Sequence, residues 1–294
     1  MKYPNFMCFP MARHQPSPAT TILFVGNSFT YGDPAGAAPL VQEFRPHTVT
    51  DLNGTHIGGV PALFKAMTEE AGLDFQVILE TEGGTGLDFH HDTRYDTIVK
   101  PWDIVLLQSY STLDEDDPGN PAKLIRYSSL LAQAFHAQNP AVDVRLTATW
   151  SRADQTWLDT GAWHGKGIAR MALDVRRACD AAASHPINGV IPVGEAWNRA
   201  IAVGVACANP YQGMAPGEVN LWAPDAYHGS VHGYYLEAAT IFGHVTGRDP
   251  RLLGAFDPIA RELGIEARVA GALQAIAAAQ LAAENRPELE RRAA

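Results

Sequence analysis

The stretch Thr21-Ile22-Leu23-Phe24-Val25-Gly26-Asn27-Ser28-Phe29-Thr30 decides the fold. Its first five residues form a short, mostly apolar run that leads directly into Gly26. A short run of this kind is typical of a strand that is covered on both faces. Gly26 permits a tight turn where a side chain would clash. We therefore expect Ser28 to lie at the carboxyl end of a buried first strand.

Similar runs recur along the chain and alternate with helical patterns. The runs cover residues 75–79, 104–107, 142–149 and 189–192. Apolar residues recur at helical spacing over residues 60–71, 124–135, 168–179 and 231–245, and an Ala-rich helix is expected from 265 to about 284. This alternation predicts an α/β fold with three α/β/α layers, a flavodoxin-like doubly wound parallel sheet of about five strands. Ligands of such sheets bind outside the carboxyl ends of the strands.

The chain divides into one domain and two terminal segments. We expect an N-terminal extension at residues 1–20, a single α/β domain at 21–284 and a charged C-terminal tail at 285–294. Within the domain, residues 33–59 and 209–225 are long and irregular. Segments of this length serve as binding walls or as plain surface excursions, and the sequence leaves both open.

Composition narrows the class of partner. The 294 residues carry a formal net charge of −10 without a Lys/Arg cluster, which argues against nucleic acid and anionic membranes as partners. No stretch reaches 18 apolar residues, so no membrane span is expected. Cys8, Cys179 and Cys207 suggest neither a disulfide framework nor a zinc site. Residues 1–20 lack the apolar core of a signal peptide, which favours a cytoplasmic protein, with secretion and homo-oligomer formation left open.

Three residues form a candidate catalytic group. Asp225 and His228 are three residues apart at an expected loop-to-helix junction, where both can face one cavity. A carboxylate can then hold the imidazole through Nδ1 and leave Nε2 free for the Ser28 hydroxyl. A hydroxyl is a poor nucleophile until an oriented base removes its proton, so this combination predicts nucleophilic catalysis by Ser28.

Four blocks of the chain resemble the SGNH (GDSL-like) hydrolases. Residues 26–30, Gly-Asn-Ser-Phe-Thr, are similar to their first block, and residues 225–228, Asp-Ala-Tyr-His, to their last. Residues 82–87, Glu-Gly-Gly-Thr-Gly-Leu, resemble the second block, in which Gly84 matches the glycine whose amide joins the oxyanion hole. Residues 102–109 resemble the third, where the family has Asn and this chain has Gln108. The blocks span about residues 21 to 245 and imply a cofactor-free serine esterase.

The expected oxyanion donors follow from the same blocks. Acyl transfer needs donors aimed at the tetrahedral oxyanion. The amides of Ser28 and Gly84 can supply two, with Gly83 and Gly86 as competitors, and the Gln108 side chain can supply a third. If Gln108 points away, slow turnover or a different donor is expected.

Other candidate sites have competing interpretations. Trp150, Trp157 and Trp163 follow the fourth strand and could form an aromatic wall for substrate or could pack within loops. His228 and His232 are four apart, but no Glu accompanies them in a metal-site pattern. Residues 90–92, His-His-Asp, are expected at a solvated helix start or a substrate rim. We expect no metal and no cofactor.

The sequence therefore predicts hydrolysis of a small-molecule carboxylic ester through an acyl-enzyme on Ser28. One alternative is a carbohydrate or glycoside O-acetylesterase, in which the tryptophans would stack on a sugar face. An alternative of another class is a catalytically weak or inactive binding protein on the same fold, which the Gln at position 108 favours.

Overall fold

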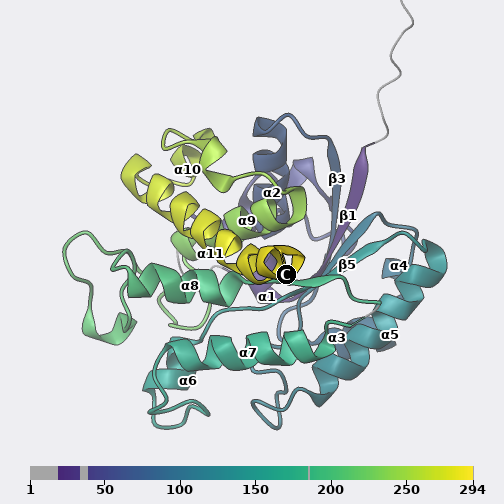
Figure 1. The fold of residues 1–294 in the computed structure, drawn as a ribbon, viewed down its shortest axis with the longest axis horizontal. Helices are drawn as coiled ribbons and strands as arrows, with labels where there is room; N and C mark the ends of the chain where they lie inside the picture. The colour runs from purple at the N-terminus through teal and green to yellow at the C-terminus, as the bar shows by residue number, and fades with distance from the viewer. Residues whose placement is uncertain (1–18, 34–38, 185, 294) are drawn as a thin grey trace, which may run out of the picture.

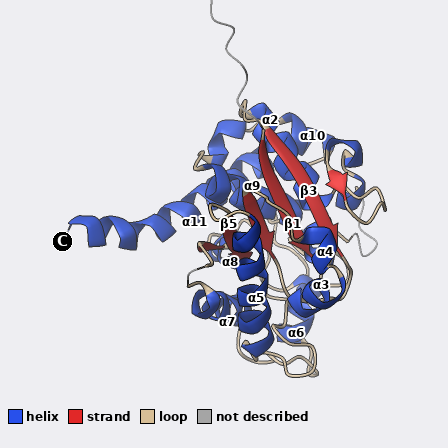
Figure 2. Ribbon diagram, turned by 90° about the vertical axis from the view of Figure 1, so that its right-hand side faces the viewer, coloured by secondary structure: helices blue, strands red, loops and turns tan. Residues whose placement is uncertain are grey.

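The computed structural model describes residues 19–33, 39–184 and 186–293, and of residues 285–293 it describes the backbone alone. The expected N-terminal extension, with Cys8, lies outside the described residues except for its last two positions. The rest forms one α/β unit in which helices cover both faces of a central sheet (Figures 1 and 2).

One parallel sheet runs through the molecule. Its strands are β1 (Thr20–Gly26), β2 (Thr50–Asp51), β3 (Phe75–Thr81), β4 (Ile104–Leu107), β5 (Asp143–Thr147) and β6 (Gly189–Ile191). Their order is β2-β3-β1-β4-β5-β6, and every pair is parallel. The prediction of a flavodoxin-like parallel sheet is confirmed, but the count of five strands is wrong. The strand that was not expected is β2. It is only two residues long and lies in the irregular segment 33–59, where no apolar run marks it.

Helices α1–α7 lie between successive strands, α8–α11 follow the last strand, and together they form the two outer layers. They are α1 (Ser28–Tyr31), α2 (Gly59–Glu70), α3 (Leu87–Thr93), α4 (Tyr95–Ile98), α5 (Ala122–Gln138), α6 (Ala153–Trp157), α7 (Ala169–Ala182), α8 (Val193–Ala202), α9 (Val231–Thr246), α10 (Pro258–Glu262) and α11 (Ala267–Ala293). Short 3-10 turns lie at η1 (Val41–Glu43), η2 (Pro46–Thr48), η3 (Pro210–Gln212) and η4 (Pro250–Leu253). Helix α11 continues past residue 284, so the backbone of the expected tail is helical through residue 293.

Two hydrophobic cores flank the sheet, and β1 contributes to both. Ile22 and Phe24 belong to the core that α2, α8, α9, α10 and α11 cover. Leu23 and Val25 point to the opposite core, beneath α3, α5 and α7. Successive side chains of a strand alternate between its faces, so a strand buried on both sides is apolar throughout. This explains why residues 21–25 contain no polar break.

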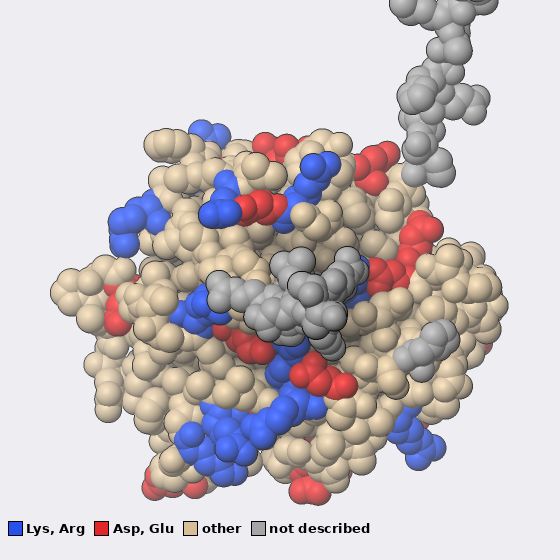
Figure 3. Space-filling model, viewed as in Figure 1, with Lys and Arg blue, Asp and Glu red and all other residues tan. Residues whose placement is uncertain are grey.

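Ion pairs tie the outer helices together around α7. In Figure 3, Lys and Arg side chains gather around this helix. Arg176 of α7 contacts Asp180 on its own helix, Glu195 of α8 at 2.8 Å and Glu284 of α11 at 2.7 Å. The basic side chain therefore links three helices. No helix among the described residues is long and apolar enough to cross a membrane.

The carboxyl ends of β1, β3 and β4 meet at one edge of the sheet. The backbone N–H of Glu82, just after β3, donates to the carbonyl of Gly26 at 3.1 Å. The N–H of Gln108, just after β4, donates to the carbonyl of Val25 at 2.9 Å. Three of the blocks that the sequence singled out are thus neighbours at the strand ends.

Candidate active site

Ser28 begins helix α1 directly after β1. The Asn27 side chain caps this helix by accepting a hydrogen bond from the N–H of Phe29 at 3.1 Å. A Cβ on Gly26 would lie 2.2 Å from Thr30 Oγ1 and 2.7 Å from Gln108 Oε1. No side chain larger than hydrogen fits there, which is why the tight turn needs glycine. The Ser28 side chain is held at the strand end in a fixed direction.

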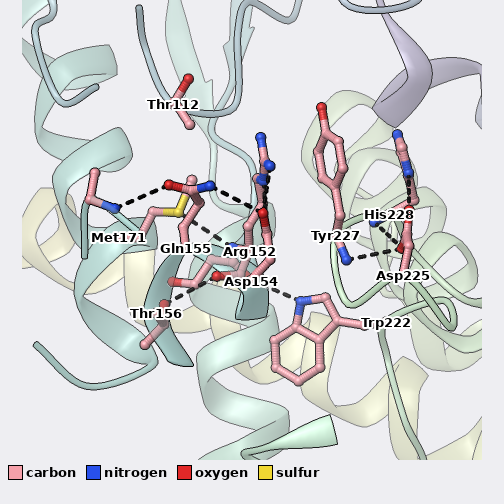
Figure 4. Close-up of polar contacts among 12 residues, drawn as sticks. Thr112, Arg152, Asp154, Gln155, Thr156, Met171, Trp222, Asp225, Tyr227 and His228 are labelled. Atoms are coloured by element: carbon pink, nitrogen blue, oxygen red, sulfur yellow. Dashed lines mark hydrogen bonds and ion pairs between the residues drawn. The ribbon is translucent and has the colours of Figure 1, made fainter. Parts of the chain in front are cut away.

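Ser28, His228 and Asp225 lie in line. His228 Nε2 lies 2.9 Å from Ser28 Oγ, and His228 Nδ1 lies 2.6 Å from Asp225 Oδ2. The other oxygen of Asp225 accepts the backbone N–H groups of Tyr227 and His228, each at 3.0 Å (Figure 4). The structure thus brings together three side chains from two distant segments, in the order that a charge-stabilised base requires.

The environment favours the ionised form of Asp225. Burial acts to raise the pKa of this carboxyl, but the hydrogen bonds from the His228 ring and from two backbone N–H groups outweigh it and lower the pKa below its usual value of 3.8. Hydrogen bonds to a carboxylate stabilise its charge. Asp225 therefore remains an acceptor that can orient the His228 ring near neutral pH.

Backbone hydrogen bonds and ring contacts hold the turn between Asp225 and His228. Ala226 has a left-handed backbone with φ of 58°, and its carbonyl accepts the N–H groups of Ala153 and Asp154 at the start of α6. The Tyr227 ring stacks on the His228 ring with centroids 4.0 Å apart. The guanidinium carbon of Arg152 lies 3.5 Å from the centroid of the same tyrosine ring (Figure 4). Such cation–π contacts contribute about 0.5–2 kcal/mol.

The backbone N–H groups of Ser28 and Gly84, two of the expected oxyanion donors, remain available. Gly84 lies in an exposed turn with φ of 69°, and its carbonyl accepts a hydrogen bond from the Tyr110 hydroxyl at 2.8 Å. Within the described part of the chain, neither the N–H of Gly84 nor that of Ser28 donates to another group. Both are backbone donors of the kind that stabilises an oxyanion.

Gln108 has a different role from the expected one. Its side chain is buried, and its Oε1 accepts the N–H of Asn27 and the hydroxyl of Thr30, each at 3.0 Å. Its Nε2 donates to the carbonyl of Ser109. The longer side chain folds back onto the turn at residues 26–30, so we correct the expectation of a third oxyanion donor: Gln108 holds this turn together.

The three tryptophans do not form one wall. Trp150 is fully buried, stacked between Phe29 at 4.3 Å and Trp197 at 4.4 Å. Trp163 is also buried and donates to Asp174 at 2.9 Å. Trp157 is the exposed member, and its ring N–H donates to the carbonyl of Ala208. The interpretation as a shared substrate wall is wrong, because two of the rings pack in the interior.

A polar hollow of about 210 Å³ lies beside the turn that carries Asn27 and Ser28. It is lined by Asn27, Gly84, Tyr110, Ser111, Thr112, Glu115, Pro118, Arg152, Gln155 and Tyr227. Figure 4 shows the side chains of Thr112, Gln155, Arg152 and Tyr227 around this space. Arg152 is held by both oxygens of Asp154, at 3.0 and 2.6 Å, so its charge is balanced locally.

Two histidines from the candidate metal clusters, His90 and His232, lie in the surroundings described here. His90 is fully buried, so the expected solvated position is wrong for this residue. Burial lowers the pKa of His232, which favours its neutral form. Across the described residues, no three or more His, Cys, Asp or Glu side chains are grouped so that they could hold a metal ion.

Comparison with known proteins places the fold. No family model matches the sequence, and no curated protein matches it. Among solved structures, a DUF4886 family protein from Bacteroides uniformis is similar with a TM-score of 0.59 and 17% identity, over 90% of this chain and 95% of that one. A candidate GDSL-like lipase from Parabacteroides merdae has a TM-score of 0.53 and 14% identity, over 78% of this chain and 96% of that one.

The chain therefore shares its fold with a GDSL-like lipase. At these identities the likeness is one of fold, and the SGNH resemblance read from four short blocks is borne out at that level.

Sequence reasoning missed two groups of residues around the site. Arg152 and Gln155 follow β5 without a recognisable spacing, so no pattern marked them. Glu80 carried a signal, because a charged residue inside the otherwise apolar run of β3 needs a buried partner. That partner is His90, on the helix that follows.

Proposed function

We propose that this protein is a serine ester hydrolase in which Ser28 is the nucleophile. The observation that carries the proposal is the line of contacts from Asp225 through His228 to Ser28, at 2.6 and 2.9 Å. These lengths suit proton transfer from the hydroxyl to Nε2. Ser28 would attack the ester carbonyl, and His228 would take the hydroxyl proton and return it to the leaving alcohol.

The second half of the reaction uses the same groups. His228 removes a proton from water, the water oxygen attacks the acyl carbonyl, and Ser28 leaves with the proton that His228 returns. Asp225 holds the ring so that Nε2 faces Ser28 and stabilises the imidazolium that forms. The free N–H groups of Ser28 and Gly84 support an oxyanion hole of two backbone donors. With Gln108 occupied elsewhere, we expect slow turnover, since one donor is typically worth roughly 3–4 kcal/mol of barrier.

Hydrolysis of p-nitrophenyl acetate tests this function. We expect the protein to release p-nitrophenol in the absence of added metal or cofactor, and we expect Ser28→Ala to reduce kcat/KM to the background of the assay. Activity of the variant equal to that of the unmodified protein would overturn the proposal. An absence of any esterase activity in both would favour the binding-protein alternative.

A second candidate function is removal of acetyl groups from carbohydrates or glycosides. The observation that favours it is the lining of the hollow, where hydroxyl, amide, guanidinium and carboxylate groups outnumber apolar ones. A long alkyl chain gains little in such a space, whereas sugar hydroxyls can exchange hydrogen bonds with it.

A comparison of ester substrates separates the two candidates. The polar hollow leads us to expect a higher kcat/KM for acetylated xylose or p-nitrophenyl acetate than for p-nitrophenyl octanoate. A preference for the octanoate would contradict the carbohydrate candidate and leave the general esterase proposal standing.

A further inference from the structure

A second carboxylate–histidine pair lies buried behind the loop that carries Gly84. Glu80 is on β3 and His90 is on α3, and both side chains are fully buried. His90 Nδ1 lies 2.5 Å from Glu80 Oε2, while Arg94 Nε donates to Glu80 Oε1 at 3.2 Å. Removing ionisable groups from water costs several kcal/mol unless they are well bonded. The remaining ring nitrogen of His90 is buried as well, and it also needs a partner.

The other ring nitrogen of His90 faces the loop. His90 Nε2 lies 3.4 Å from Thr85 Oγ1, and the Thr85 hydroxyl donates its single proton to the carbonyl of Glu82 at 2.9 Å. The roles in this contact depend on the ring: a neutral His90 that donates Nδ1–H to Glu80 presents Nε2 as an acceptor for the Thr85 hydroxyl, and a doubly protonated ring presents it as a donor. In this way the buried pair holds the residue that closes the turn around Gly83 and Gly84.

Thr85 also connects the loop to the nucleophile turn. Its carbonyl accepts a hydrogen bond from Asn27 Nδ2 at 2.8 Å. The Oδ1 atom of the same Asn27 caps the helix that begins at Ser28. A continuous series of hydrogen bonds thus runs from Glu80 through His90 and Thr85 to the turn of Ser28.

The loop depends on contacts from outside because its own residues restrict the backbone little, and the Tyr110 hydroxyl, which donates to the carbonyl of Gly84, is another side-chain group that holds it. Gly83 and Gly84 are both exposed, and glycine restricts the backbone less than any other residue. Oxyanion donors act only if they are held at about 2.7–3.1 Å from the position of the developing charge. An unsupported Gly84 N–H would reach that position in only part of the population.

We propose that Glu80 and His90 are positioning residues that hold Thr85, and through it the N–H of Gly84, in register with Ser28. The inference rests on the proposed esterase function. Neither residue touches the substrate, and both act through the loop. The pair is therefore expected to affect stabilisation of the tetrahedral intermediate and to leave binding of the ground-state ester unchanged.

Four variants test the inference by steady-state kinetics on p-nitrophenyl acetate. His90→Gln removes the ring nitrogen that contacts Thr85, and Thr85→Val removes the hydroxyl while keeping the shape of the side chain. We expect each to lower kcat by roughly ten- to a hundred-fold, less than the 10²–10³ that outright loss of a donor costs, with KM within about two-fold of the unmodified protein. Thr85→Ser keeps the hydroxyl and should restore kcat. His91→Gln is the matched control, because His91 lies next along the same helix and pairs with Asp92 at the surface.

A boronic acid that forms a tetrahedral adduct with serine provides a second measurement. Its affinity would not change if His90 and Thr85 served only to stabilise the fold. We expect this affinity to fall in His90→Gln and Thr85→Val by the same factor as kcat/KM, at an unchanged circular dichroism spectrum. A folded His90→Gln protein with normal kcat and normal boronate affinity would overturn the inference. So would a Thr85→Ser variant as impaired as Thr85→Val.

Two further outcomes keep this inference separate from the proposed function. If His90→Gln does not fold, Thr85→Val, which leaves the buried pair in place, provides the same comparison. If the unmodified protein hydrolyses no ester and binds no boronate, the proposed function itself has failed and this inference with it. Normal esterase activity together with insensitive variants is a failure of the positioning inference alone.

Discussion

His228 Nε2 lies 2.9 Å from Ser28 Oγ, although 200 residues separate the two along the chain. Ser28 follows β1, and His228 lies shortly before α9. The ring of His228 is kept in place by Asp225 on one side and by the stacked Tyr227 ring on its face. This contact is the basis of the proposed chemistry, and the predictions below follow from the groups that maintain it.

Asp225→Asn should abolish most activity while leaving the fold intact. The amide can no longer accept the Nδ1 proton of His228 as a carboxylate does, so the ring takes the wrong tautomer for accepting the Ser28 proton. A loss of kcat of roughly 10⁴-fold is the size found when a triad carboxylate is changed in this way. Asp159→Asn is a suitable control, because its side chain is almost fully exposed. Normal kcat in Asp225→Asn would argue against a role for this carboxylate.

Gln108→Ala should lower stability as well as activity. The substitution leaves the N–H of Asn27 and the hydroxyl of Thr30 without their acceptor in the interior. Each unsatisfied group costs about 1–3 kcal/mol, so the midpoint of urea denaturation should fall clearly. A variant with unchanged stability and a kcat reduced by roughly 10²–10³-fold would instead show that Gln108 is a direct oxyanion donor.

The tryptophans should differ in their contributions. Trp150→Ala removes a ring that is fully buried between two other rings, and we expect it to lower the free energy of unfolding by about 3–5 kcal/mol. Trp157→Ala removes a partly exposed ring and should change neither stability nor KM for p-nitrophenyl acetate by much. A large rise in KM in Trp157→Ala would show that this residue contributes to substrate binding.

Glu237 should make stability depend on pH. Its side chain in α9 is buried, and its Oε2 has no hydrogen-bond partner among the described residues. Burial raises the pKa of Glu237 well above its usual value of 4.5. The folded protein therefore keeps a proton that the unfolded chain releases as pH rises above this value, and stability falls by about 1.4 kcal/mol for each unit of pKa difference.

Glu237→Gln keeps the size of the side chain and removes its titration. We expect its Tm to exceed that of the unmodified protein at pH 7. The difference should shrink toward pH 4, where Glu237 is mostly protonated in both the folded and the unfolded state. A difference in Tm that is constant between pH 4 and pH 7 would show that this carboxyl is not titrating as described.

The sequence predicted the sheet well because strands buried on both faces are apolar throughout. All five expected runs became strands, whereas β2 was missed because its two residues, Thr50 and Asp51, are held by pairing with β3 and carry no pattern of their own. Helix α8 was also missed, although the run of 189–192 that leads into it was recognised.

At the site, sequence order could suggest which blocks meet, but side-chain direction could not be read from it. Gln108 occupies the position where the family has Asn, and one additional methylene lets its amide reach back to Asn27 and Thr30. Trp150 follows a strand at the active edge, yet its ring points into the core. Both outcomes depend on packing across the sheet, which involves residues far away in the chain.

Covalent labelling with a fluorophosphonate is the most direct test of the central claim that Ser28 is an activated nucleophile. Intact mass measurement after labelling should show one adduct per chain, and peptide mapping should locate it on Ser28. Ser28→Ala should not label, and His228→Ala should label far more slowly. A folded protein that remains unlabelled, or that carries the adduct on another residue, would contradict the account.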